Sequence, residues 1–159
     1  MRICDVVACR DFPCQDTNPA GYIIPACDIQ PEKFSVLLIS EAAPPNPTDG
    51  YYAAGISLFA RSTLQAFQDA GAKVACIADL LALGVYLTSA VKCAKTGYAI
   101  ASDSILACSR LLENELAVFS RVKAILLMGD VSIKALNAIA RRNGEPRVIP
   151  AGSTYKIRA

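Results

Sequence analysis

The sequence of 159 residues contains no histidine. The side chain that most often serves as general base near neutral pH is therefore absent, and any metal site must be built from sulfur and oxygen ligands. No apolar run reaches the ~18 to 20 residues that would span a bilayer, and residues 1–5 do not begin the long apolar stretch of a secretory signal. We therefore expect a soluble, cytoplasmic protein that does not bind a membrane.

Glycine-rich phosphate loops are also missing. Neither GxGxxG nor GxxxxGK(S/T) occurs in the sequence. The loop after the first expected strand carries Pro44, Pro45 and Pro47, which have no amide hydrogen to offer a phosphate. An unrelated α/β nucleotide-binding protein is therefore the least favoured functional class.

Cysteine is abundant, with seven residues in a chain of one-domain size and no sign of export. This usage favours thiolate ligands for a metal over a disulfide framework. Residues 1–30 hold four of the cysteines, lack a helical period and contain three prolines. We expect them to form an irregular, cysteine-rich N-terminal flap on a single domain covering residues 1–159. Cys76 is expected to be an inert, buried thiol.

Charge is unevenly distributed along the chain. Residues 1–91 carry a net charge of −4, whereas residues 92–159 carry a net charge of +6. A basic half suits a polyanion such as DNA. Solvating charges on exposed helix faces would give the same composition, so charge alone does not decide between the two interpretations.

Apolar runs and amphipathic stretches alternate along the sequence. They predict strands near residues 34–39, 73–77, 85–91, 123–128 and 147–150, and helices over residues 53–70, 102–119 and 130–140. Strands that are apolar throughout indicate a parallel sheet covered on both faces. The predicted fold is α/β, a three-layer α/β/α sandwich with a central, mostly parallel four-stranded sheet. Ligands of such sheets bind beyond the carboxyl ends of the strands.

Several segments carry a resemblance to a known family. Residues 40–45 (SEAAPP) and 51–53 (YYA) form one motif, residues 86–93 (YLTSAVKC) and 107–113 (ACSRLLE) form a second, and residues 124–129 (AILLMG) continue the match. Together they resemble the uracil-DNA glycosylase superfamily, most closely its iron–sulfur class. The resemblance covers about residues 9–142.

The resemblance implies an enzyme that flips a uracil-type base out of DNA and hydrolyses its N-glycosidic bond in base-excision repair. Glu41 would stabilise the cationic sugar and orient the attacking water, and Tyr51 or Tyr52 would stack on the flipped base. Ser89 stands where the family usually reads uracil with an asparagine amide. This assignment requires Glu41 and Ser89 to converge on one hollow.

The resemblance also implies a 4Fe-4S cluster, with zinc as the alternative metal. Four cysteines are the expected ligands, two near the N-terminus and two bracketing a loop: Cys9, Cys14, Cys93 and Cys108. Cys4 or Cys27 could replace one of the first pair. The cluster would tie the flap to the sheet and present Lys92, Lys95 and Arg110 to the phosphates of DNA, either lesion-containing or single-stranded. We expect a monomer.

The family's second catalytic loop usually brings a histidine, followed by a segment that wedges into the duplex. This chain has no histidine and ends at Ala159. Either the C-terminal part of the family domain is truncated, or this branch uses other residues, or it has lost the activity. The competing hypothesis is therefore a catalytically silent member that binds DNA or a protein partner.

Overall fold

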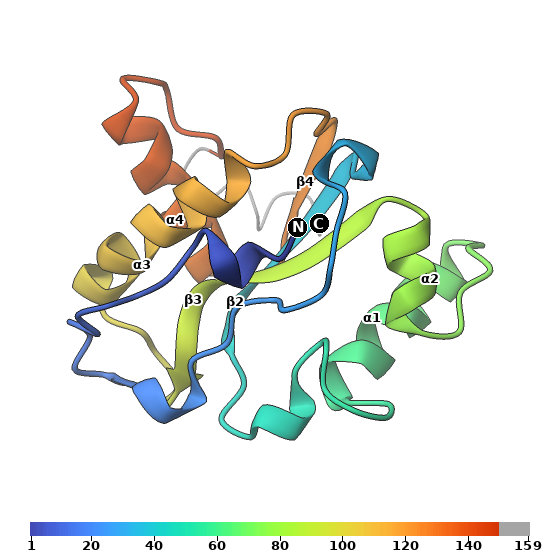
Figure 1. Cartoon of the computed structure of the whole chain (residues 1–159). Coiled ribbons are helices and arrows are strands. Elements are labelled where there is room, and N and C mark those ends of the chain that lie inside the picture. The colour runs from blue at the N-terminus through green and yellow to red at the C-terminus, as the bar shows by residue number, and fades with distance from the viewer. Residues whose placement is uncertain (150–159) are drawn as a thin grey trace, which may run out of the picture.

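The computed structural model describes residues 1–149 and has an α/β fold. Its strands and helices, labelled in Figure 1, are β1 (Thr17–Asn18), β2 (Val36–Ala43), α1 (Leu58–Asp69), α2 (Ile77–Ala82), β3 (Val85–Lys95), α3 (Ser102–Leu116), β4 (Ala124–Leu127) and α4 (Asp130–Arg142). Among the described residues there are also four short 3-10 helices, one before β1 and three between β1 and α1. Within residues 1–149, no helix combines the length and apolar character needed to cross a membrane.

The four strands form one mixed sheet in the order β1-β3-β2-β4. β2 lies at the centre and pairs in parallel with β3 and with β4, whereas β1 pairs antiparallel with β3. The fourth strand was expected at residues 147–150, but residues 147–149 are not in a strand, and residue 150 lies outside the described part. The N-terminal segment supplies it instead, because β3 runs to Lys95 and leaves an edge that Thr17 and Asn18 can pair with.

Helices contact both faces of the sheet (Figure 1). Leu38 and Leu87 pack in one apolar cluster with Leu64 of α1. Their neighbours on the strands face the other way, as the two-residue period of a strand requires, and Ile39 packs in a second cluster with Leu112 of α3. The alternation of strands and helices in the sequence therefore predicted the α/β class correctly.

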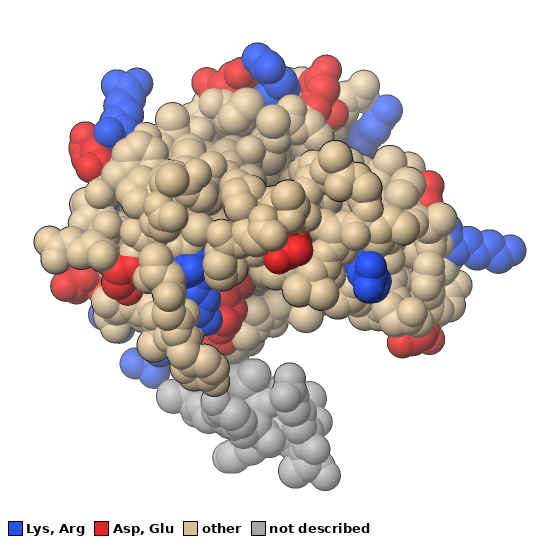
Figure 2. Space-filling model, turned by 90° about the horizontal axis from the view of Figure 1, so that it is seen from below, with Lys and Arg blue, Asp and Glu red and all other residues tan. Residues whose placement is uncertain are grey.

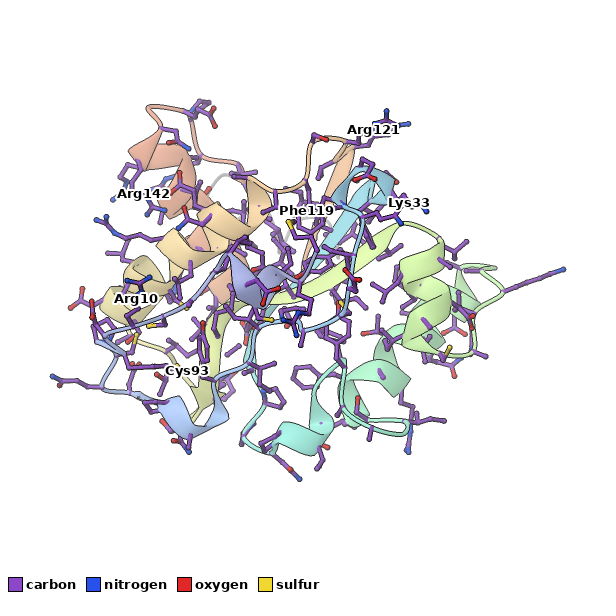
Figure 3. The ribbon with its side chains drawn as sticks, in the orientation of Figure 1. Arg10, Lys33, Cys93, Phe119, Arg121 and Arg142 are labelled. Atoms are coloured by element: carbon purple, nitrogen blue, oxygen red, sulfur yellow. The ribbon has the colours of Figure 1, made fainter. Side chains whose placement is uncertain are left out.

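Residues 1–30 are irregular, as expected, but they belong to the core. Ile3, Val7 and Ile29 are buried in a third apolar cluster, together with Tyr86 of β3 and Phe119, which Figure 3 labels near the middle of the molecule. The N-terminal segment is therefore held by buried apolar surface, the main favourable term in folding. It does not depend on a metal alone for its position.

The short strand expected at residues 73–77 is absent. The Asp79 carboxylate accepts hydrogen bonds from the amides of Ala75 and Cys76, at 2.7 and 3.1 Å between nitrogen and oxygen, and helix α2 begins at Ile77. An acid at the start of a helix competes with strand pairing in this way. Cys76 is exposed, so the expectation of a buried thiol was wrong.

An ion pair between Lys92 of β3 and Glu115 of α3 lies in the interior, with both side chains 0% exposed. The Lys92 ammonium also donates to Thr88 Oγ1 at 2.8 Å and to the Ser89 carbonyl at 2.6 Å. The Tyr86 hydroxyl donates to the other Glu115 oxygen at 2.7 Å, and burial, reinforced by this carboxylate, raises the pKa of Tyr86. All three ammonium hydrogens have acceptors, as a buried charge requires.

Removing one partner of this pair should be costly. We expect Glu115→Ala to lower the free energy of unfolding by about 3 to 5 kcal/mol, because the Lys92 ammonium would remain buried without its counter-charge. The double variant Lys92→Met with Glu115→Leu removes both charges, so its free energy of unfolding should fall by less than that of Glu115→Ala. Urea denaturation followed by circular dichroism measures both changes.

The control is Lys134→Ala, which breaks an exposed ion pair with Asp130 and should change stability little. Wild-type stability in the Glu115→Ala variant would contradict the assignment of this pair as a central contact.

Candidate functional site

The four cysteines expected to bind a metal line one cavity of about 450 Å³. Cys9 and Cys14 come from the N-terminal segment, Cys93 from β3 and Cys108 from α3. Figure 3 shows Cys93 and Arg10, which also lines this cavity, on the side of the molecule where α3 lies. We call this space the cysteine cavity. The fold thus brings together two pairs of thiols that lie far apart in the sequence.

Contacts with Asp16 hold the N-terminal part of the cysteine cavity in place. Its carboxylate accepts a hydrogen bond from the amide of Ala101 at 2.6 Å and another from the hydroxyl of Ser104. These bonds lower the pKa of Asp16 and satisfy an amide at the start of α3, where backbone donors lack helical partners. Asp16 thus fixes the segment that bears Cys14 against the helix that bears Cys108.

The thiols of the cysteine cavity are in an apolar setting. Burial raises the pKa of Cys108 to about 11, even though the amide of Lys92 donates to its sulfur at 3.2 Å. Burial also raises the pKa of Cys93. Neighbouring thiols add to both shifts, Cys14 among them.

The arrangement differs from the site of a single metal ion. Within residues 1–149, no three cysteine, aspartate or glutamate side chains converge closely enough to hold one ion as they stand. Cys4 and Cys27, the alternative ligands, pack instead against the apolar cluster around Ile3 and Tyr86. Among the described residues, the soft sulfur ligands at the cysteine cavity are therefore those of the four expected residues.

The three residues expected to bind a base also come together. Tyr51, Tyr52 and Ser89 line a second cavity, of about 240 Å³, which we call the tyrosine cavity. The Tyr51 ring packs edge-on against Phe59, with 5.3 Å between ring centroids. The Tyr52 hydroxyl donates to the Leu87 carbonyl at 2.8 Å, which fixes the Tyr52 ring. Two aromatic faces and a hydroxyl are suited to holding a planar, polar ring.

Glu41 does not share the tyrosine cavity with Ser89. Ser40 pairs with Ser89 in the parallel register, so these two side chains point to the same face and Glu41 points to the other. One Glu41 oxygen accepts from the amide of Val131 at 3.4 Å, and the other lies 3.6 Å from the Lys95 ammonium. The expected convergence of Glu41 and Ser89 on one hollow is therefore not found.

Gly129 explains how the Glu41 carboxylate fits against the start of α4. Gly129 has φ of +108°, and a Cβ atom built on it would lie 2.6 Å from a Glu41 oxygen. A larger residue would meet both backbone strain and a clash. The Glu41 carboxylate lies near the amino end of α4, where the helix dipole favours negative charge.

The basic residues expected to contact DNA lie in different settings. Lys92 is fully buried and its ammonium is saturated, so the expectation that it faces phosphates was wrong. Lys95 pairs with Glu41 and lies 5.4 Å from the centroid of the Tyr98 ring. Arg110 is exposed and lines the cysteine cavity together with Arg10. A place for Arg10 at this cavity was not predicted, although Arg10 directly follows Cys9, one of the expected metal ligands.

Figure 2 views the molecule from below Figure 1, toward the end where β2 and β3 terminate. Most of this face is uncharged, and several of the basic groups on it lie directly beside acidic groups. The positive charge of residues 92–159 does not form a continuous basic surface over the described part of this face. Contacts with a polyanion on this face would therefore be local.

No family model matches this chain, and searches of curated proteins and of solved structures find no match either.

Alkylation rates test the setting of these thiols. In metal-free protein near neutral pH, we expect iodoacetamide to modify Cys76 well before Cys108, because the thiolate is the reactive form and Cys108 is buried with a raised pKa. Mass spectrometry of digested samples taken over time measures both rates. Equal rates at the two cysteines would show that the cysteine cavity is open to solvent.

Proposed function

We propose that this chain is an iron–sulfur DNA glycosylase of the uracil-DNA glycosylase superfamily. It would take a flipped, uracil-type base into the tyrosine cavity and hydrolyse its N-glycosidic bond. The observation that carries the proposal is the cysteine cavity. The resemblance selects four of the seven cysteines as ligands, and these four line one cavity although the two pairs are separated by a long stretch of sequence.

The finer description of the fold belongs to the same proposal. We assign the chain a three-layer α/β/α sandwich, supported by the packing of α1 and α2 residues with Leu38 and of α3 and α4 residues with Ile39 on the opposite face of β2. The parallel pairs β2–β3 and β2–β4 form its centre. We also propose that the protein is cytoplasmic and acts as a monomer.

The resident group of the cysteine cavity is proposed to be a 4Fe-4S cluster. Such a cluster takes one thiolate on each of its irons, so its ligands stand farther apart than the four ligands of a single zinc ion. This spacing suits thiols that line a cavity without converging on one point. The cluster would cross-link the N-terminal segment, β3 and α3. Arg10 and Arg110, which line the same cavity, would be available to bind DNA phosphates.

The tyrosine cavity would hold the extruded base. Extrusion costs a few kcal/mol, and least for a mismatched or damaged pair. The rings of Tyr51 and Tyr52 would recover part of that cost by stacking, at about 1 to 3 kcal/mol per base. Ser89, which lines the same cavity, would add a polar contact to the base.

Glu41 is the proposed catalytic carboxylate. Bond cleavage leaves positive charge on the sugar, which a nearby carboxylate stabilises while it orients water. The Glu41 side chain is 35% exposed and lies near the carboxyl end of β2. Because it points to the face opposite Ser89, the proposed catalysis requires the sugar of the flipped nucleotide to reach that face.

A catalytically silent member of the superfamily is the second candidate. The separation of Glu41 and Ser89 on opposite faces of β2 and β3 favours it specifically, and so does the lack of histidine. In this case the protein binds DNA or a protein partner without cleaving the glycosidic bond.

Base release from a uracil-containing oligonucleotide distinguishes the two candidates. We expect the wild-type chain to release uracil and Glu41→Gln to be slower by about 10²- to 10⁴-fold, the usual contribution of a general acid–base group. Glu32→Gln, at an exposed carboxylate before β2, is the matched control and should keep the wild-type rate.

Equal rates for wild type and Glu41→Gln would remove Glu41 from the mechanism. Binding without any base release by the wild type would establish the silent candidate instead.

A further inference from the structure

One buried hydroxyl group in the described part of the chain has no hydrogen-bond partner. Within residues 1–149, the side-chain oxygen of Thr17 is the single buried side-chain nitrogen or oxygen atom without one. Thr17 belongs to β1, is 6% exposed and lines the cysteine cavity. Taking a hydroxyl out of water without giving it a partner is unfavourable. An unpaired buried group of this kind therefore points to a partner that binds there.

The pairing of β1 with β3 brings this hydroxyl near Cys93. Thr17 pairs with Lys95 in the antiparallel register, and Cys93 lies two residues before Lys95, at the diagonal position across such a pair. Thr17 and Cys93 both line the cysteine cavity. Burial raises the pKa of Cys93, and the Thr17 hydroxyl opposes that rise, as a donor near the sulfur does. The Cys93 sulfur is therefore the metal ligand placed to accept from Thr17.

The state of the sulfur decides how well it can accept. A neutral thiol is a weak acceptor, whereas a cysteine that ligates iron does so as a thiolate. Hydrogen bonds to a charged acceptor are roughly twice as strong as those between neutral groups. The Thr17 hydroxyl has one hydrogen to donate, and no described residue accepts it. A thiolate at Cys93 would supply the acceptor that this hydroxyl lacks.

We infer that Thr17 is a positioning residue, which donates its hydroxyl hydrogen to the Cys93 thiolate when that thiolate ligates the cluster. This inference rests on the proposed function and adds a residue to the same cavity. Hydrogen bonds to metal ligands orient the ligands and tune the bound group, and those to sulfur help to set the reduction potential of an iron–sulfur cluster. Thr17 therefore stabilises the cluster-bound protein and contributes no side-chain hydrogen bond to the metal-free protein.

Thr17→Val separates these two states, because valine is also branched at Cβ and lacks only the hydroxyl. In metal-free protein the change breaks no hydrogen bond, so the thermal midpoint should stay at the wild-type value or rise. In cluster-bound protein the loss of one net hydrogen bond should make iron release to a chelator about 3- to 10-fold faster. Thr17→Ser keeps the donor and should restore the wild-type rate. Thr48→Val, at an exposed threonine outside the cysteine cavity, is the matched control.

The reduction potential is a second readout, which a purely structural role would not change. One added electron increases the negative charge on the cluster and its thiolates, so a hydrogen bond to sulfur is stronger in the reduced state. Thr17→Val should therefore lower the potential, by up to about 60 mV for a tenfold change in a one-electron equilibrium. Thr17→Ser and Thr48→Val should keep the wild-type potential. Voltammetry of the full chain, loaded with its cluster and kept free of oxygen, measures it.

The possible failures are distinguishable. A wild type that holds the cluster, with the same iron release and potential in Thr17→Val, would overturn this inference and leave the proposed function standing. Thr17→Val that is destabilised equally in metal-free and cluster-bound protein would also overturn it, because the hydroxyl would then have a structural role. A wild-type chain that takes up no iron and sulfide would overturn the proposed cluster, and this inference with it.

Discussion

The buried ion pair between Lys92 and Glu115 is the contact on which the arrangement of the cysteine cavity depends. It joins β3 to α3, and both side chains are fully buried. A shift or rotation of the helix would therefore leave a buried charge without its partner. Cys93 follows Lys92 directly, and Cys108 lies two helical turns before Glu115 on the same face of α3. The pair therefore fixes the distance between two of the four thiols. The hydrogen bond from the Lys92 amide to the Cys108 sulfur strengthens the same link.

The N-terminal segment completes the cysteine cavity through contacts of its own. Its apolar residues are part of the core, and Thr17 and Asn18 pair with β3. The Asp16 carboxylate accepts a hydrogen bond from the amide of Ala101, directly before α3. These contacts hold the segment that bears Cys9 and Cys14 against β3 and α3, which bear Cys93 and Cys108, so that all four line one cavity.

The sequence predicted most elements because periodicity and apolar runs reflect burial directly, as at Val36–Ala43 and Ser102–Leu116. It did not predict β1, a strand of two residues whose existence depends on the free edge of β3. The burial of Lys92 was also unforeseen, because lysine is usually exposed and its partner Glu115 comes from another element. The separation of Glu41 and Ser89 depends on the register of β2 against β3, which residue patterns alone do not determine. The tyrosines and Ser89 come together as expected, because Tyr51 and Tyr52 follow β2 and Ser89 lies on β3, which pairs with β2.

The central claim is that Cys9, Cys14, Cys93 and Cys108 hold an iron–sulfur cluster in the cavity that they line. The most direct measurement is the content of iron and acid-labile sulfide in protein purified without oxygen. The account predicts iron and sulfide in equal amounts, as in a 4Fe-4S cluster, with both lost in Cys108→Ser and both retained in Cys76→Ser. Anaerobic protein without iron or sulfide, or a cluster that survives Cys108→Ser unchanged, would contradict it.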